Sequence, residues 1–187
     1  PPRDTTDARE EHDFHCPLMS LPDAVDPSGL TIPEPVAITV PEASRVAMRR
    51  RIAPYAASFR IGVAWSGSGA DTDEARGALP LARLLPLAAL AGVQLFSLQT
   101  GAAATEQHEA GAAGFVVDLG AQCRHFGDTA AALEQMDLVV CCDGAVAHLA
   151  AAMEKPVLGL LQFRPHWVYG MQGDATPWYP TMRLLRQ

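Results

Sequence analysis

The sequence predicts an α/β fold built on a doubly wound parallel sheet and preceded by an extended N-terminal arm. First, short apolar runs alternate with helix-length segments from Arg60 onward, which is the pattern of successive βαβ units. Second, residues 138–142 form an unbroken apolar run, LVVCC, which suits a strand buried on both faces of a parallel sheet. Third, hydrophobic residues make up 49% of the 187 residues, enough for one packed domain of ordinary size plus a tail.

The expected strands and helices follow one another in regular order. The strands cover residues 61–65, 93–98, 115–118, 138–142, 157–161 and 183–185. The helices between them cover residues 81–91, 103–113, 129–136 and 145–153. Asp128 and Asp143 precede the last two helices, where an N-cap carboxylate is favoured, and Pro156 ends the last one.

Residues 1–58 differ from the rest because prolines interrupt them repeatedly. Within this segment only residues 42–52 have a composition that suits a helix. We therefore expect residues 1–58 to be a Pro-rich arm or interdomain linker, and residues 59–187 to form a Rossmann-like domain of their own.

The turn after the predicted strand at 138–142 is the most informative part of the chain. Gly144 and Ala145 keep the entry to the next helix small, so that the free N–H groups of the helix face outward at the carboxyl edge of the sheet. Those N–H groups and the helix dipole attract a phosphate. Asp143 would repel a phosphate, so it either caps the helix or holds the turn and accepts sugar hydroxyls. His148 could donate a proton to a ligand or simply bond a backbone carbonyl.

A second loop at the same edge follows the first predicted strand and contains Ser66, Gly67 and Ser68. Its amides and hydroxyls can approach a phosphate, although it has the glycine spacing of neither a P-loop nor a dinucleotide site, and a plain surface loop is the alternative. Arg76 can clamp a phosphate or pair with the acidic residues around it. Three aromatic residues after the last strands either stack on a base or close the core: Trp167, Trp178 and Tyr179.

Composition argues against several other classes of protein. The chain has no apolar run near 20 residues and a net charge of −7, so we expect neither a membrane span nor a nucleic-acid partner. Cys141 and Cys142 lie inside a predicted buried strand, which favours a reducing, cytoplasmic setting. His12, His15 and Cys16 lack a fourth ligand for zinc, and no nucleophile–base pair with a known spacing is present, so no metal site and no catalytic residue is predicted.

Five stretches of the sequence together carry a resemblance to a known family. They are DFHCPLMSLP at 13–22, RIGVAWSG at 60–67, VQLFSLQTG at 93–101, HFGDTAAALEQMDLVVCCDGAVAHLAAAMEKPV at 125–157 and ATPWYPTMRLLRQ at 175–187. In this order they resemble the C-terminal, donor-binding half of GT-B glycosyltransferases of family 9, the ADP-heptose:lipopolysaccharide heptosyltransferase type. The version found behind tetratricopeptide repeats in bacterial proteins is the most similar.

The resemblance implies one of two Rossmann-like domains that face each other across a cleft, with residues 1–58 as the linker between them. This domain would bind a nucleotide-sugar linked to ADP, GDP or UDP, without a cofactor, while the other domain would supply the catalytic base. The expected partners are therefore the nucleotide-sugar and an N-terminal domain or a repeat protein. We expect the chain to be a fragment or a reduced form of such an enzyme.

The resemblance also implies the donor-site residues. They are Ser66, Gly67, Ser68, Arg76, Gln99, Asp143, Gly144, Ala145 and His148, with Gln99 near the base or ribose. The family has a hydroxyl residue where Gly144 stands and a lysine where Thr100 stands, and the acidic loop at 70–76 keeps Arg76 as its one cation. These losses favour an alternative function, that of a non-catalytic scaffold or regulatory domain that kept the fold.

Overall fold

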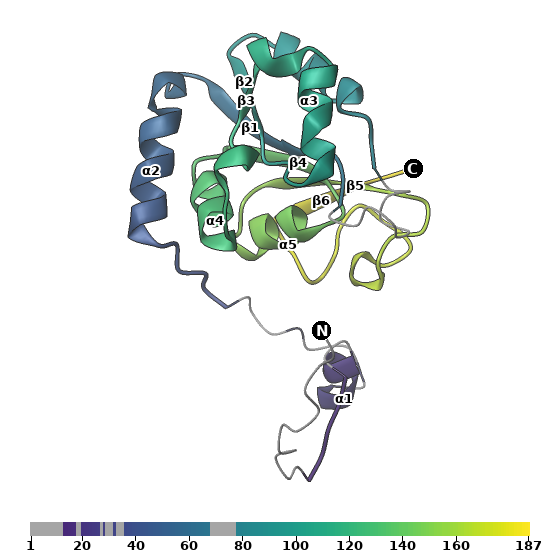
Figure 1. Ribbon diagram of the computed structural model, residues 1–187. Coiled ribbons are helices and arrows are strands. Elements are labelled where there is room, and N and C mark those ends of the chain that lie inside the picture. Colours follow the sequence, from purple (N-terminus) through teal and green to yellow (C-terminus); the bar gives the residue numbers. More distant parts are fainter. Residues whose placement is uncertain (1–12, 18–19, 27, 29–31, 33–35, 68–77) are drawn as a thin grey trace, which may run out of the picture. The chain divides into compact units, whose positions relative to one another are not determined.

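The computed structural model describes residues 13–17, 20–26, 28, 32, 36–67 and 78–187 (Figure 1). The chain divides into two compact units, Pro1–Glu34 and Pro35–Gln187. In the smaller unit, helix α1 (Leu21–Val25) buries none of its side chains. The larger unit holds the sheet and begins well before residue 59, so the expected boundary at 58 stays a prediction about the linker of a longer protein.

Six parallel strands form one sheet in the larger unit. They are β1 (Phe59–Ala64), β2 (Val93–Ser97), β3 (Val116–Asp118), β4 (Leu138–Cys142), β5 (Val157–Leu161) and β6 (Met182–Arg186). Their order is β3-β2-β1-β4-β5-β6, with every neighbouring pair parallel. The order of the strands reverses between β1 and β4, which is the Rossmann-like arrangement. The predicted fold class is confirmed.

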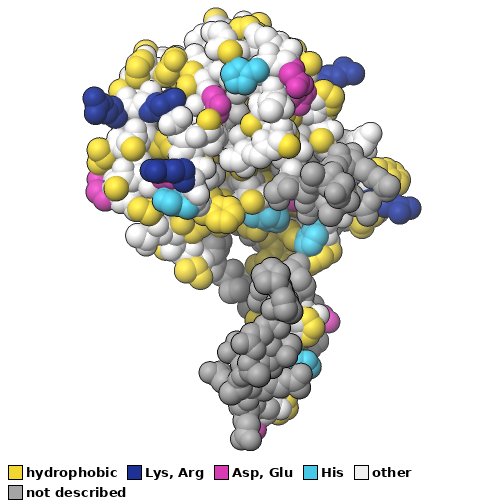
Figure 2. Space-filling model, viewed as in Figure 1, with side chains coloured by type: hydrophobic (Ala, Val, Ile, Leu, Met, Phe, Trp, Pro, Cys, Tyr) yellow, Lys and Arg dark blue, Asp and Glu magenta, His cyan; other side chains and the backbone are white. Residues whose placement is uncertain are grey.

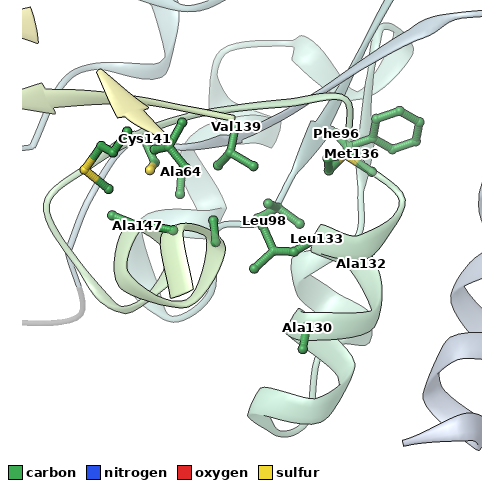
Figure 3. Packing of buried hydrophobic residues seen from close by; sticks show 14 of the residues in the cluster. Ala64, Phe96, Leu98, Ala130, Ala132, Leu133, Met136, Val139, Cys141 and Ala147 are labelled. Carbon is green, nitrogen blue, oxygen red and sulfur yellow. The ribbon is translucent and has the colours of Figure 1, made fainter. Parts of the chain in front are cut away.

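Helices cover both faces of the sheet, as Figure 1 shows. On one face lie α2 (Glu42–Ile52), α4 (Phe126–Glu134) and α5 (Ala145–Ala152), which share one apolar cluster with alternate residues of the strands. In Figure 3, Leu133 of α4 lies close to Leu98, and Ala147 of α5 lies below Ala64 and Cys141. The other face packs Ile61, Val63 and Trp65 under a second apolar cluster.

The helical segments on the second face are shorter than expected, because glycine and proline interrupt the helical backbone there. Instead of one helix over 81–91 there are two 3₁₀ segments, η4 (Leu81–Arg83) and η5 (Leu85–Ala89), since Pro86 lacks the N–H that an α-helix needs. Instead of one helix over 103–113 there are three short pieces: η6 (Ala102–Thr105), α3 (Glu106–Glu109) and η7 (Ala112–Gly114). Gly111 separates the last two at φ 64°, a left-handed conformation that ends a helix.

The start of α4 corrects the expectation that Asp128 is its N-cap. His125 is the N-cap, and its Nδ1 accepts a hydrogen bond from the Asp128 amide at 3.2 Å. The Asp128 carboxylate in turn accepts from the Arg124 amide at 3.0 Å, so the two side chains satisfy free N–H groups reciprocally. The other Asp128 oxygen accepts from Ser44 Oγ at 2.7 Å, which ties α2 to α4.

Arg60 and Asp137 join the amino ends of β1 and β4 by two side-chain hydrogen bonds of 2.9 and 2.7 Å, and the Arg60 amide donates to the same carboxylate at 2.8 Å. The Arg60 hydrogen bond is the main reason that the pKa of Asp137 lies below its ordinary value, although burial opposes the shift.

No helix in the described part of the chain is long and apolar enough to cross a membrane.

Stability should therefore fall in acid. A carboxylate whose folded pKa is depressed stabilises the fold above its unfolded pKa, about 3.9 for aspartate, and that contribution is lost as the pH falls through the folded value. Urea unfolding at a series of pH values below 5 should show a shallower acid loss for Asp137→Asn than for the parent. Equal acid losses in the two proteins would contradict this assignment.

Candidate functional site

The candidate site lies where the loops after β1 and β4 meet at the carboxyl edge of the sheet. A β-carbon placed on Gly144 would lie 3.5 Å from the Cα atom of Gly67, so the two turns touch. Gly144 has an extended backbone, φ 161° and ψ −178°, and serves as the N-cap of α5. Among the described residues no side chain caps α5, so its first N–H groups are available to an anion.

Gln99, two residues after the end of β2, holds the β1 loop in place by hydrogen bonds. Its Oε1 accepts from the Trp65 and Ser66 amides at 3.0 and 2.9 Å, and its Nε2 donates to the Ser66 and Thr100 carbonyls at 3.1 Å each. Its side chain is buried and bonded entirely to backbone. These contacts assign Gln99 a positioning role for Ser66, and a contact of Gln99 with a base or ribose stays a prediction.

Asp143 does not cap α5, which corrects one of its two expected roles. Its Oδ1 accepts a hydrogen bond from the Tyr169 hydroxyl at 2.9 Å and lies 3.5 Å from His148 Nε2. The carboxylate therefore lies beside α5. It accepts its hydrogen bond from a tyrosine of η9 (Trp167–Tyr169) and not from the free amides of the helix.

His148 belongs to the same polar cluster and is not bonded to a backbone carbonyl through its ring. Its Nδ1 lies 2.9 Å from the Tyr179 hydroxyl, and its Nε2 lies 3.4 Å from the Tyr169 hydroxyl. The His148 and Tyr169 rings stack at a centroid distance of 5.7 Å and an angle of 17°. About a third of the His148 side chain stays exposed (37%), so a ligand at this edge can reach it.

The electrostatics of the cluster favour one ionised carboxylate among neutral hydroxyls. Burial alone would raise the pKa of Asp143, but hydrogen bonds from His148 and Tyr169 outweigh it and hold that pKa below its ordinary value. Burial, reinforced by the Asp143 charge, raises the pKa of Tyr169 well above its ordinary value and raises that of Tyr179 as well. Asp143 thus accepts hydrogen bonds, and the neighbouring amides attract a phosphate.

Several expected residues lie outside the part of the chain that the structure describes. Ser68 and Arg76 fall in the segment 68–77, and His12 of the rejected zinc group falls in 1–12. Among the described residues, no group of three or more His, Cys, Asp or Glu side chains is placed to hold a metal ion. Cys141 and Cys142 lie buried in β4, and burial raises the pKa of both thiols.

The sequence did not predict that two tyrosines, Tyr169 and Tyr179, belong to this polar cluster. Tyr169 stands in a loop rich in glycine and proline, where no spacing links it to Asp143, 26 residues away. Tyr179 was expected either to stack on a base or to close the core; it packs against the apolar cluster, and its hydroxyl also lies 2.9 Å from His148 Nδ1. The Trp167 and Trp178 rings contact each other edge to face at 5.6 Å beside this loop.

The sequence of this region matches the model of a known family. Residues 87–169 match the family model described as glycosyltransferase family 9 (heptosyltransferase). This stretch of the chain carries the family 9 pattern. It includes β4, α5 and Tyr169, and it confirms the resemblance seen in the sequence. No curated protein matches the chain significantly.

Two solved structures share the fold. The family 9 glycosyl transferase from Veillonella parvula has 14% identity and a TM-score of 0.63, and the match covers 88% of this chain and 47% of that one. The E. coli ADP-heptose lipopolysaccharide heptosyltransferase II has 16% identity and a TM-score of 0.60, and the match covers 82% of this chain and 47% of that one. The chain therefore spans about half the length of these family 9 structures.

Proposed function

We propose that the larger unit binds the nucleoside-diphosphate sugar donor of a glycosyltransferase at the carboxyl ends of β1 and β4. The observation that carries this proposal is the meeting of the Gly67 and Gly144 turns where the strand order reverses, within a chain that matches family 9. Open α/β sheets bind their ligands at such a reversal, because neighbouring loops diverge there and leave a crevice.

The diphosphate is held chiefly by backbone amides in this proposal. The N-terminal N–H groups of α5, from Ala145 onward, point toward the edge of the sheet and have no side-chain cap. Ser66 adds a hydroxyl, which now donates to the Gly67 carbonyl at 3.2 Å. Ser68 and Arg76 remain proposed donor ligands from the same loop. Amides supply the charge stabilisation that the leaving diphosphate needs, so the reaction requires no metal here.

Asp143 and His148 serve the sugar side of the donor in this proposal. An ionised Asp143 held by Tyr169 accepts sugar hydroxyls and keeps the diphosphate toward the amides. His148, oriented by Tyr179, then lies between the sugar and phosphate positions.

Glycosyl transfer itself, of a hexose or heptose, is proposed for a longer protein with a second domain that supplies the base and the acceptor site. The chain spans about half of its structural relatives, which agrees with one half of a GT-B enzyme. A reducing, cytoplasmic compartment, which the two buried free thiols of β4 suit, is proposed as the setting of the reaction.

Thermal unfolding with ADP-, GDP- and UDP-sugars tests the proposal. One of these donors should raise the melting temperature, since a ligand at 100 times its Kd adds about 2.7 kcal/mol to the stability. Tyr169→Phe should reduce the shift, because it removes the hydroxyl that orients Asp143. Tyr55→Phe is the matched control, since Tyr55 packs edge-on against Phe96 at 5.3 Å, away from the proposed site. If no donor shifts the parent protein, the proposal fails and the scaffold function gains support.

A further inference from the structure

A groove of about 700 Å³ lies between α2 and the loop that leads into α4, apart from the β1–β4 crevice. We call it the arginine groove, and the residues that matter in its lining are Met48, Arg50, Arg51, Gln122, Arg124 and Asp128. Figure 2 shows Lys and Arg side chains close together over α2, on the left of the view. The volume suits a small molecule.

Both walls of the arginine groove carry cations. Arg50 and Arg51 stand three and four residues after Ala47, so all three share one strip of the α2 surface, with the buried Met48 beside them. Arg124 comes from the opposite wall, and its backbone is fixed by the hydrogen bond from its amide to Asp128. A ligand between the walls can therefore meet guanidinium groups from both sides.

Within the described residues, ion pairs leave the three arginines of the groove largely uncompensated. Arg45, on the same helix, pairs with Glu42 and Glu134. Among the residues that the structure describes, Arg50, Arg51 and Arg124 form no such ion pair with a carboxylate. Asp128 is the single carboxylate in the described lining; its oxygens accept from Ser44 and the Arg124 amide, and its charge offsets part of that of Arg124. The groove is thus cationic in a chain whose net charge is −7.

We propose that the arginine groove is a second anion site, which binds a phosphate-bearing small molecule. Guanidinium groups bind phosphate oxygens in pairs, and each such charge-assisted contact is stronger than a neutral hydrogen bond. A diphosphate spans the two walls better than a single carboxylate does, because it offers acceptors to both Arg124 and the α2 pair. The proposed donor site works differently, through helix amides, so the two sites share no residue.

Calorimetric titration with inorganic pyrophosphate, at constant ionic strength set by sodium chloride, tests the arginine groove. The variant R50Q/R51Q/R124Q should bind pyrophosphate at least about tenfold more weakly than the parent, since charge-assisted hydrogen bonds are lost. Arg49→Gln is the matched control, because Arg49 is exposed on the same helix and does not line the groove. Circular dichroism should show that all of these surface variants fold.

Three results would overturn the proposal that the arginine groove is an anion site. The first is absence of pyrophosphate binding to the parent, and the second is an equal loss in Arg49→Gln, which would mean diffuse surface charge. The third is binding of heparin without binding of pyrophosphate, which would mean a macromolecular polyanion as partner. A donor-sugar thermal shift that persists in R50Q/R51Q/R124Q would show that the proposed donor site is separate. Repeating the titration with ADP distinguishes a nucleotide from a simple phosphate as the ligand.

Discussion

Replacing Gly120 by alanine should destabilise the fold by about 3 kcal/mol, at the upper end of what an added methyl group costs in a packed interior. A β-carbon at Gly120 would lie 1.9 Å from the Gln99 carbonyl oxygen and 2.8 Å from its carbonyl carbon. Both atoms belong to the backbone, so no side-chain rotation relieves the overlap, and the loops after β2 and β3 must move apart.

The damage from Gly120→Ala should extend to the candidate site. Gln99 is the residue that fastens Ser66, so a shift of its backbone loosens the loop after β1. Donor binding should therefore weaken by more than the fraction of unfolded protein explains.

Urea unfolding and thermal melting measure the effect of Gly120→Ala, with an expected drop in melting temperature of roughly 6–12 °C for a domain of this size. Gly114→Ala is the matched control, since a β-carbon there meets no atom within 4 Å and Gly114 does not need a left-handed backbone. Equal stability of the two variants would show that the close approach of Gly120 to Gln99 is wrong.

Strands were easier to predict than the contacts that make the site. The apolar runs at 138–142 and 157–161 correspond to β4 and β5 residue for residue, because a strand buried on both faces leaves no room for polar side chains. The segments 81–91 and 103–113 were wrongly predicted to be continuous helices. Apolar spacing alone does not show that Pro86 and Gly111 interrupt the helical backbone.

The role of Asp143 depends on a partner distant in sequence. A cap is a local interaction and can be predicted from neighbouring residues. The Tyr169 hydroxyl, in contrast, is close to Asp143 only because β5 pairs with β4 in the folded sheet. Asp128 was assigned as the cap of α4, but His125 fills that position and Asp128 bonds the distant Ser44 of α2. Residue propensities predicted the position of each turn, but they did not predict which of the competing hydrogen bonds each aspartate makes.

Family 9 resemblance and structure together make a gain-of-affinity experiment possible. The family pattern expects a hydroxyl residue at Gly144 and a lysine at Thr100. Gly144 has an ordinary extended backbone, and a β-carbon there would meet Gly67 at a normal contact distance of 3.5 Å, so the backbone accepts a side chain. Thr100 is exposed in the loop after β2, and its carbonyl accepts from the same Gln99 amide group that bonds Ser66 of the β1 loop. Both positions therefore flank the proposed diphosphate position.

The double variant Gly144→Thr with Thr100→Lys should bind ADP at least about tenfold more tightly than the parent, because a charge-assisted contact to phosphate contributes roughly 1.5–3 kcal/mol. The gain should shrink at high salt, which screens the added lysine. Thr181→Lys is the matched control, since it places the same new charge before β6, at the opposite edge of the sheet, where the Thr181 carbonyl accepts from the Val157 amide at 3.2 Å. Calorimetric titration of the three proteins with ADP and UDP measures the effect. If the double variant folds normally and binds no better than the Thr181→Lys control, then the diphosphate does not lie between the β1 loop and the start of α5.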